Sequence, residues 1–335
     1  MKSKARKSQL IRLSFFISLL LMGLKFVAYF ITQSTAILTD AVESIVNVVA
    51  SGFAFYSIWL ANQPKDEDHP YGHGKIEFFS AGVEGVLILL AGVYILGQSI
   101  YSFFSPKVIS DLPLGLLLLS IASVANGVLG WYLRKEGKRM DSLTLYADGK
   151  HLLTDFYSSL VLLLGVVLIY FTNQFWLDSA LSLGFSLFIL YNGYQLIRSS
   201  VSGLMDESDK ESLQKIANIM NASRKPSWID IHNMRVLKYG ADLHVDCHVT
   251  LPYYFTLEQV HEELHELEEQ LQKNINNELE IFTHADPCIP ELCCRYCRIS
   301  DCSVRQSAYT EDIEWNLGNL AKNQKHYYNL NTTQY

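Results

Sequence analysis

The apolar residues of this chain are concentrated before residue 200, and the rest of the chain is polar. Long apolar runs in the first part are separated by short polar loops. A run of about 18 or more apolar residues is long enough to cross the hydrocarbon core of a bilayer as a helix. The pattern therefore predicts six membrane-spanning helices, over residues 9–31, 35–61, 77–104, 112–134, 143–171 and 175–198.

Basic residues in the loops predict the orientation of these spans. Lysine and arginine accumulate in short loops on the cytoplasmic side of a membrane. Here they are concentrated in the segments 2–12, 62–76 and 134–142, whereas the alternate loops contain little beyond Lys107. Both termini are therefore expected in the cytoplasm. The first apolar run is too long for the hydrophobic region of a signal peptide, so we expect it to be retained.

Two pairs of polar residues lie inside the predicted spans. His151 and Asp155 are in the fifth span, and Glu43 and Asn47 are in the second. Residues four apart share one face of a helix, roughly 6 Å apart along its axis, so the members of each pair can point at one ion. A carboxylate near the bilayer centre costs about 2.5–3.5 kcal/mol and needs a partner or a function. A single polar residue can also serve helix packing, but two such pairs together indicate an intramembrane ion site.

The chemistry that these four side chains offer is metal binding with proton exchange. Four protein ligands close a tetrahedral coordination sphere, whereas a catalytic zinc keeps one position open for water. The chain contains no H-E-x-x-H, G-x-S-x-G or phosphate-binding P-loop motif, which argues against hydrolysis and ATP-driven pumping. Ligands must lose their protons before they bind a metal. We therefore expect a carrier that exchanges a metal cation for protons, not an enzyme, with metal ions as cargo or regulators and no further cofactor.

The loop after the second span and two positions inside spans add further candidates. Asp66, His69 and His73 could hold a divalent ion at the cytoplasmic side, and a polar turn before the third span is the alternative. Glu84 in the third span could line an ion path, or it could be protonated and hydrogen-bonded between helices. Asn126 in the fourth span is interpreted as a helix-packing residue.

The polar part of the chain has the pattern of a small soluble domain over residues 207–290. Apolar and polar residues alternate over 243–249, which is typical of a strand with one buried face. Its patterns predict an α+β fold made of a helix, two strands, a helix and a strand, near 208–223, 229–238, 242–250, 256–273 and 279–284. We expect residues 1–200 to form the membrane domain and residues 291–335 to form a poorly ordered, cysteine-containing tail.

Histidines are unusually frequent in this second domain. A histidine on a solvated face is ordinarily only polar surface. The alternative is a set of bridged metal ions at a contact between domains or subunits, with ligands from His232, His248, His261, His284 and Asp286.

All six cysteines also lie in the polar part of the chain. In a reducing cytoplasm they are expected as thiols or metal ligands before disulfides. Cys294 and Cys297 have a C-x-x-C spacing, but no second C-x-x-C pair accompanies them, so soft-metal binding and free thiols both remain open. The net charge of −7 lies mainly in this part and argues against nucleic acid as a partner.

Taken together, these features resemble the cation diffusion facilitator family over residues 9–290. The resemblance is carried by the six spans, the polar pairs on spans two and five, the sequence His-Pro-Tyr-Gly-His-Gly-Lys at 69–75 and the histidine-bearing domain. It implies an α-helical membrane protein with six transmembrane helices plus a cytoplasmic α+β ferredoxin-like domain. It also implies a homodimer with alternating access and proton exchange, embedded in lipid, and we expect it in the inner membrane of a bacterium. Lys75 and Asp206 match a charged pair that connects subunits near the membrane surface in this family.

The resemblance also assigns metal sites. It implies a transport site on spans two and five, a loop site, and cytoplasmic-domain sites, formed respectively by Glu43, Asn47, His151 and Asp155; by Asp66, His69 and His73; and by His232, His248, His261, His284 and Asp286. The cysteines from Cys288 to Cys302 have no counterpart in this pattern.

Span two departs from the usual zinc pattern, in which a histidine or aspartate is followed four residues later by aspartate. Here the residues are Glu43 and Asn47, and Asp40 is the alternative ligand. The leading hypothesis is export of a divalent transition metal from the cytoplasm in exchange for protons, with zinc first and iron, manganese or cobalt as alternatives. The other hypothesis is a membrane-bound metal-sensing or metal-storing protein with a vestigial transport site. The presence of His151 and Asp155 in apolar surroundings favours transport.

Overall fold

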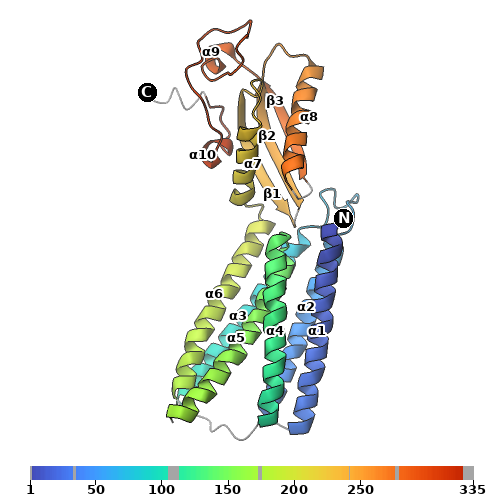
Figure 1. The fold of residues 1–335 in the computed structure, drawn as a ribbon, viewed down its shortest axis with the longest axis vertical. Coiled ribbons are helices and arrows are strands. Elements are labelled where there is room, and N and C mark those ends of the chain that lie inside the picture. Colours follow the sequence, from blue (N-terminus) through green and yellow to red (C-terminus); the bar gives the residue numbers. More distant parts are fainter. Residues whose placement is uncertain are drawn as a thin grey trace. The chain divides into compact units, whose positions relative to one another are not determined.

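The computed structural model describes residues 2–32, 35–104, 113–172, 176–240, 242–275 and 279–326 (Figure 1). The chain divides into two compact units, Met1–Met205 and Asp206–Tyr335. Each unit has a hydrophobic core of its own.

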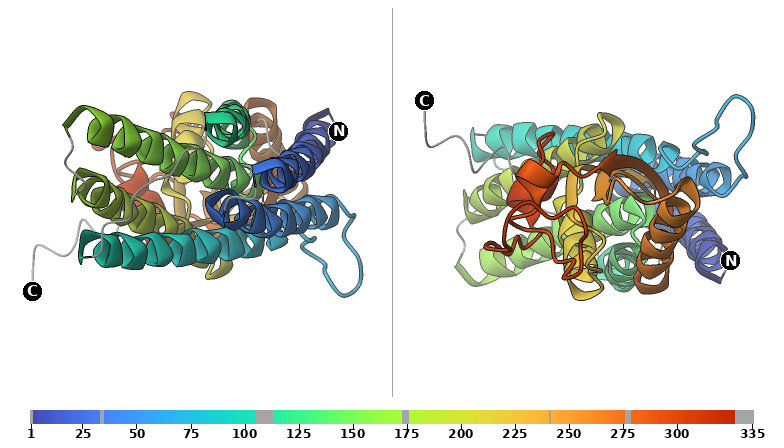
Figure 2. Two further views of the ribbon diagram at one scale, coloured as in Figure 1. Left: turned by 90° about the horizontal axis from the view of Figure 1, so that it is seen from below. Right: turned by 90° about the horizontal axis from the view of Figure 1, so that it is seen from above.

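The first unit is a bundle of long helices. They are 27 to 31 residues long, and at about 1.5 Å per residue each exceeds the roughly 30 Å of a bilayer's hydrocarbon core. Helix α3 packs mainly on α6, α4 on α5 and α1 on α2, and Figure 2 shows the helices running side by side. Their bounds are α1 Lys2–Thr32, α2 Thr35–Ala61, α3 Ile76–Phe104, α4 Pro113–Arg139, α5 Leu143–Thr172 and α6 Trp176–Leu204.

The helices correspond to the six predicted spans but extend beyond several of them. Helix α1 begins at Lys2 rather than near residue 9, because lysine and arginine are good helix formers and continue the helix past its apolar part. Among the described side chains, the stretches Ala5–Val27 and Ile76–Tyr101 are long and apolar enough to cross a membrane. The other four spans include side chains outside the described part, so the count of six spans stays a prediction.

Large apolar side chains cover much of the outer surface of this bundle. Phe16 and Leu20 of α1 are exposed, as are Val128 and Trp131 of α4. Soluble proteins rarely expose extended apolar patches, whereas lipid contact requires them. The surface is that of a bundle solvated by hydrocarbon.

Two glycines bring α4 and α5 into close contact. A Cβ atom on Gly149 would lie 2.4 Å from the backbone nitrogen of Arg134, and one on Gly130 would lie 2.8 Å from the carbonyl oxygen of Gly149. Small residues of this kind allow the backbones of membrane helices to approach. The contact fixes the part of α5 that carries His151 and Asp155.

The second unit is an α+β domain, as predicted. Its three described strands lie in the order β1-β2-β3, with β1 antiparallel to β2 and β2 parallel to β3. The parallel pair is connected through α8, which begins with a capping box between Thr256 and Gln259. The bounds are α7 Lys210–Ala222, β1 Asp230–Tyr239, β2 Asp242–Leu251, α8 Leu257–Asn274, β3 Leu279–Pro287, α9 Pro290–Cys293 and α10 Leu317–Leu320.

Strand β1 contains an irregularity beside its first histidine. The register shifts between His232 and Arg235, and Asn233 has a φ of 52°, a left-handed conformation that asparagine tolerates better than most residues. The Asn233 N–H donates to the carbonyl oxygen of Lys322 at 2.8 Å. The end of the described chain therefore returns alongside β1.

The expectation of a poorly ordered tail from residue 291 is wrong for residues 291–326. Trp315 and Leu320 are buried in the same core as Ile231 and Val245 of the sheet. This segment packs through isolated apolar side chains and has only a short helix, α10, so it shows no periodicity from which order could be predicted. The domain predicted as 207–290 therefore continues to at least residue 326, and residues 327–335 lie outside the described part.

Asn221 holds this returning segment to helix α7. Its side-chain Nδ2 donates to the carbonyl oxygen of Trp315 at 2.6 Å, and its Oδ1 accepts from the Trp315 N–H at 3.1 Å. Asn221→Ala leaves the Trp315 carbonyl oxygen and N–H without these two hydrogen bonds. The loss is expected to cost about 1–3 kcal/mol of unfolding free energy. The measurement is urea denaturation of the fragment 206–335. Asn218→Ala, on the exposed face of the same helix, is the control, and equal midpoints for the two variants would contradict the assignment.

Candidate metal sites

Helices α2 and α5 bring three of the four predicted transport-site residues together. Asn47 Nδ2 lies 2.5 Å from Asp155 Oδ2, and His151 Nε2 lies 2.8 Å from Asn47 Oδ1. His151 Nε2 and Asp155 Oδ2 are 4.0 Å apart along one face of α5. Asn47 and His151 are buried, and Asp155 is half-buried. Three potential ligands from two helices thus converge at one point of the bundle.

The hydrogen-bond directions in this cluster are fixed by the amide. An amide oxygen only accepts, so His151 Nε2 carries the hydrogen that it shares with Asn47 Oδ1. The amide nitrogen donates to the Asp155 carboxylate. The nitrogen and oxygen that a metal would bind are therefore engaged by hydrogens. Glu43 and the alternative ligand Asp40 also lie on α2, but their side chains are outside the described part.

Asp148 continues this polar cluster and was given no role in the sequence analysis. It is fully buried and accepts from Ser14 Oγ at 2.6 Å and from Ser51 Oγ at 3.0 Å. Asp148 precedes His151 by three residues, and Ser51 follows Asn47 by four, so both are one helical turn from the cluster. Residues three or four apart share one face of a helix, so the spacing that pairs His151 with Asp155 also places Asp148 on that face. Its serine partners could not be identified from the sequence.

Glu84 and Asn126 are both buried, on α3 and α4. Neither carboxyl oxygen of Glu84 has a hydrogen-bond partner among the described residues. The described contacts therefore do not support the interpretation that Glu84 is hydrogen-bonded between helices. The interpretation that it lines an ion path stays open. Burial of Asn126 agrees with a packing role.

The loop between α2 and α3 also gathers its three predicted ligands. His69 Nδ1 lies 3.0 Å from Asp66 Oδ1, and His73 Nε2 lies 3.3 Å from Asp66 Oδ2. One ligand atom from each lies within 4.8 Å of the others. The His69 backbone N–H donates to Asp66 Oδ1 at 2.7 Å, and this bond lowers the pKa of Asp66. The aspartate therefore shapes the turn and stays ionised, as a metal ligand must be, so the two interpretations of this loop do not exclude each other.

Glu77, at the end of that loop, has a structural partner. It is buried, lies 3.3 Å from Lys7 Nζ and accepts a short hydrogen bond from Ser142 Oγ. These contacts join α3 to α1 and to the start of α5. Lys75 and Asp206 fall on opposite sides of the boundary between the two units, and their pairing across subunits stays a prediction.

In the second unit, strand register builds a row of histidines. His232 pairs with His248 across β1 and β2, and His248 pairs with His284 across β2 and β3. Asp286 follows His284 by two residues and so faces the same side of the sheet. Asp286 Oδ2 lies 3.5 Å from His232 Nε2 and 3.4 Å from His248 Nδ1, and its Oδ1 lies 3.7 Å from His284 Nε2.

This cluster is suited to a metal ion. Ligand atoms of His232, His248 and Asp286 all lie within 4.8 Å of one another. Burial lowers the pKa of His232, against the raising effects of Asp230 and Asp286, which favours the neutral imidazole that binds metals. The donor set of two imidazoles and a carboxylate is one that zinc and neighbouring divalent ions accept.

The returning end of the chain adds two residues that the sequence analysis missed. Lys325 Nζ lies 3.5 Å from Asp286 Oδ2, and His326 Nδ1 makes a short hydrogen bond with the buried carboxylate of Asp230. The Lys325 ammonium group thus neutralises the Asp286 carboxylate, as a metal ion bound there would. Both residues fall in the segment that was expected to be poorly ordered.

His261 is not brought to this cluster. It lies exposed on α8 and stacks on His265, with ring centroids 6.3 Å apart. Within one chain, the structure therefore separates His261 from His232, His248 and Asp286. Its assignment as a ligand stays a prediction that involves a second subunit.

Comparison with known families decides the identity of this architecture. The model of the cation efflux transmembrane domain matches residues 11–205, and that of the cation efflux protein cytoplasmic domain matches residues 208–288. The chain belongs to the cation efflux family. The predicted resemblance to cation diffusion facilitators is thereby confirmed, as is the fold class of a helical membrane domain followed by a cytoplasmic α+β domain. Members of this family are transporters and not enzymes.

Relatives match over most of their length. An uncharacterized transporter from Synechocystis sp. is 34% identical over 267 residues, which is 79% of this chain and 86% of the relative. The manganese efflux system protein MneP from Bacillus subtilis is 28% identical over 281 residues, or 82% of this chain and 94% of the relative. The cation-efflux pump FieF from Escherichia coli is 26% identical over 274 residues, or 80% and 89%. Membership in this family supports export of divalent metal cations.

Proposed function

We propose that this protein is an antiporter that exports a divalent transition-metal cation from the cytoplasm in exchange for protons. The observation that carries the proposal is the convergence of Asn47, His151 and Asp155 inside the helix bundle. Polar groups inside a membrane helix bundle are energetically costly and mark ion pathways. These three residues offer one nitrogen and two oxygen ligands to a single ion.

The hydrogen-bond pattern supports proton exchange at the same site. The hydrogen on His151 Nε2 must leave before this atom can bind a metal, and the Asn47 amide must turn its oxygen away from His151 and its nitrogen away from Asp155. A neutral ring frees Nε2 by moving the hydrogen to Nδ1, whereas an imidazolium releases a proton, and the proposed exchange uses the second route. Metal entry therefore competes with a hydrogen-bonded, proton-bearing state. A carrier that alternates between these two states at the two membrane faces exchanges metal for protons.

The donor set bears on the identity of the metal. With Asn47 in place of a carboxylate, the site has one imidazole and otherwise oxygen ligands, which suits manganese, iron and cobalt as well as zinc. The names of the relatives also include manganese efflux. We propose zinc as the first substrate to test and low discrimination among zinc, cobalt, iron and manganese.

Transport in everted membrane vesicles tests the proposal. The cytoplasmic face of such vesicles is outside, so an acid interior is expected to drive zinc inward, where a trapped fluorescent reporter detects it. Collapse of the proton gradient with an ionophore is expected to reduce uptake to the level of vesicles without the protein. Zinc uptake that is independent of the gradient would refute proton coupling, and absence of uptake for every metal in the panel would refute transport.

We further propose that the cytoplasmic domain binds regulatory metal and forms a homodimer. Zinc is expected to stabilise the fragment 206–335, by about 2.7 kcal/mol at a concentration one hundred times the dissociation constant. Asp286→Asn removes the carboxylate shared by the three histidines and is expected to reduce the zinc-dependent rise in melting temperature. Glu280→Gln is the control, because Glu280 lies on the same strand and contacts a histidine outside the cluster, His244 at 3.1 Å.

The readout is the difference between Asp286→Asn and Glu280→Gln in the zinc-dependent rise in melting temperature. Zinc bound elsewhere in the fragment contributes equally to both variants, so it does not affect the conclusion. Equal zinc-dependent shifts in Asp286→Asn and in the wild type would contradict the cluster. Light scattering after size exclusion measures the oligomeric state in the same samples. A metal sensor with a vestigial transport site would respond to Asp286→Asn in this assay yet move no metal in vesicles, which separates the alternative function from transport.

A further inference from the structure

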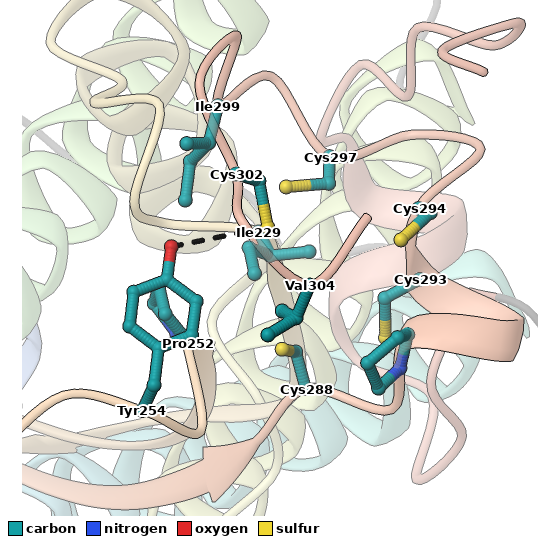
Figure 3. Close-up of a pocket in the computed structure, with 11 residues that line it drawn as sticks. Ile229, Pro252, Tyr254, Cys288, Cys293, Cys294, Cys297, Ile299, Cys302 and Val304 are labelled. Carbon is teal, nitrogen blue, oxygen red and sulfur yellow. Dashed lines mark hydrogen bonds between the residues drawn. The ribbon is translucent and has the colours of Figure 1, made fainter. Parts of the chain in front are cut away.

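Five of the six cysteines surround one small cavity in the second unit. Figure 3 shows Cys288, Cys293, Cys294, Cys297 and Cys302 around a common space, together with Tyr254 and several apolar side chains. The cavity has a volume of about 10 Å³, which is room for one small sphere and not for a multinuclear cluster. None of these cysteines forms a disulfide.

The segment that carries these thiols packs on a small apolar cluster around Ile229 and Tyr296 but has little regular structure. It contains the single-turn helix α9 and then no regular helix or strand over residues 294–316. The Arg305 guanidinium gathers the backbone by donating to the carbonyl oxygens of Cys294, Cys297 and Ile299. Short segments with only a small core are commonly stabilised by disulfides or by a metal, and a reducing compartment disfavours disulfides.

Hydrogen bonds to sulfur also orient several of these thiols. Cys293 Sγ accepts from the Ile289 N–H at 3.4 Å and from Tyr296 Oη at 3.6 Å, and Cys294 Sγ accepts from the Gln306 N–H at 3.4 Å. Tyr254 Oη lies 3.9 Å from Cys302 Sγ. Donors directed at sulfur stabilise the thiolate form that binds metals.

We propose that Cys288, Cys297 and Cys302, with one of the adjacent pair Cys293 and Cys294, bind a single thiophilic divalent ion such as Zn²⁺. Four thiolates satisfy a closed, tetrahedral zinc site, and the C-x-x-C spacing of Cys294 and Cys297 is typical of such sites. The matched cytoplasmic-domain region ends at residue 288, so this site lies at and beyond the end of the family pattern.

The described thiols are spaced more widely than the two histidine–aspartate clusters, whose ligand atoms lie within 4.8 Å of one another. Ion binding therefore contracts the loop around the cavity and tightens the attachment of the segment that leads to Trp315 and Lys325.

Cobalt substitution tests the site in the full-length protein. Reduced, metal-free protein purified in detergent is titrated with Co²⁺, and the expected result is a sulfur-to-cobalt charge-transfer absorption that saturates at a single ion per chain and is abolished by Zn²⁺. Histidine and carboxylate sites do not produce this absorption, so the result is independent of the transport proposal. Its absence in the wild type would overturn the thiolate site.

Single substitutions identify the ligands. Cys288→Ala, Cys297→Ala and Cys302→Ala are each expected to abolish the absorption. One of Cys293→Ala and Cys294→Ala is expected to abolish it as well, and the other to leave it unchanged. Cys247→Ala is the control, because Cys247 is buried in the sheet away from the cavity, where burial raises the pKa of its thiol to about 12. Retention of the absorption in Cys297→Ala would overturn the proposal.

Alkylation of the wild type gives a second measurement that requires no variant to fold. Zn²⁺ is expected to protect Cys288, Cys297, Cys302 and one of the adjacent pair from iodoacetamide, as read by mass spectrometry of peptides. Equal alkylation of these cysteines with and without Zn²⁺ would contradict the proposal. A disulfide between any two of them in freshly isolated protein, in place of bound metal, would also contradict it.

Discussion

Replacement of Asp155 by asparagine is expected to reduce metal export by more than about 100-fold, because loss of a direct ligand exceeds the 10–100-fold effect of removing an outer-shell partner. Asparagine has nearly the shape of aspartate, and its oxygen can still accept from Asn47 Nδ2, so the packing of α2 against α5 is retained. What is lost is a negative charge and an oxygen that can exchange a proton for metal.

His151→Ala tests the same site from its nitrogen ligand and is expected to have a similar effect. The control is Ser159→Ala, one turn beyond Asp155 on α5, because the bond that the Ser159 hydroxyl makes among the described residues is to the backbone carbonyl of Asp155, at 3.0 Å. All variants are compared at equal protein level in the vesicle membrane. Export by Asp155→Asn at the rate of Ser159→Ala would exclude Asp155 from the transport site.

Much of this architecture could be predicted from the periodicity of the sequence. Apolar runs located the helices of the first unit, and alternation over residues 243–249 located β2. The spacing of His151 and Asp155 was sufficient to put both on one face of α5, and the distance of 4.0 Å between them follows from that spacing. These features depend on neighbours in sequence, which is why they could be read from the chain.

Features that depend on long-range register could not be read in this way. The row from His232 through His248 to His284 exists because three strands pair in one register, and a shift of one residue would turn these histidines to the other face. The contacts of Asp148 with Ser14 and Ser51 join three helices whose rotation the sequence does not specify.

The segment after residue 290 was misread for a related reason. Its order comes from Trp315 in a core made by distant residues and from the Arg305 guanidinium, not from a repeating pattern. The cysteines were visible as a group, but their spacing alone did not separate free thiols from a metal site. The cavity that five of them line is what favours the proposed metal site.

Asn47→Asp is expected to increase zinc affinity at pH 7.5 by about tenfold or more and to make binding steeper in pH. The structure gives a reason beyond the added charge. Asn47 Nδ2 donates to Asp155 Oδ2 at 2.5 Å, and an aspartate at position 47 has no such donor. Two carboxylates at this distance repel unless a proton or a cation lies between them. A dication removes that repulsion, so the variant gains more from metal than the wild type does.

The sign of the pH effect follows from the same repulsion. At low pH the variant's carboxylate pair holds a proton that metal must displace, so affinity falls as the pH decreases, by up to about one additional logarithmic unit per pH unit relative to wild type. Wild-type Asn47 has no proton of this kind to release, and His151 and Asp155 titrate in both proteins. The measurement is zinc affinity of purified protein at pH 6 and pH 7.5, with the ligands of the loop and cytoplasmic clusters and the five cavity cysteines substituted in both backgrounds. If affinity and its pH slope are the same in both proteins, Asn47 is not a ligand, its contacts with His151 and Asp155 serve only packing, and Asp40 becomes the candidate for its position.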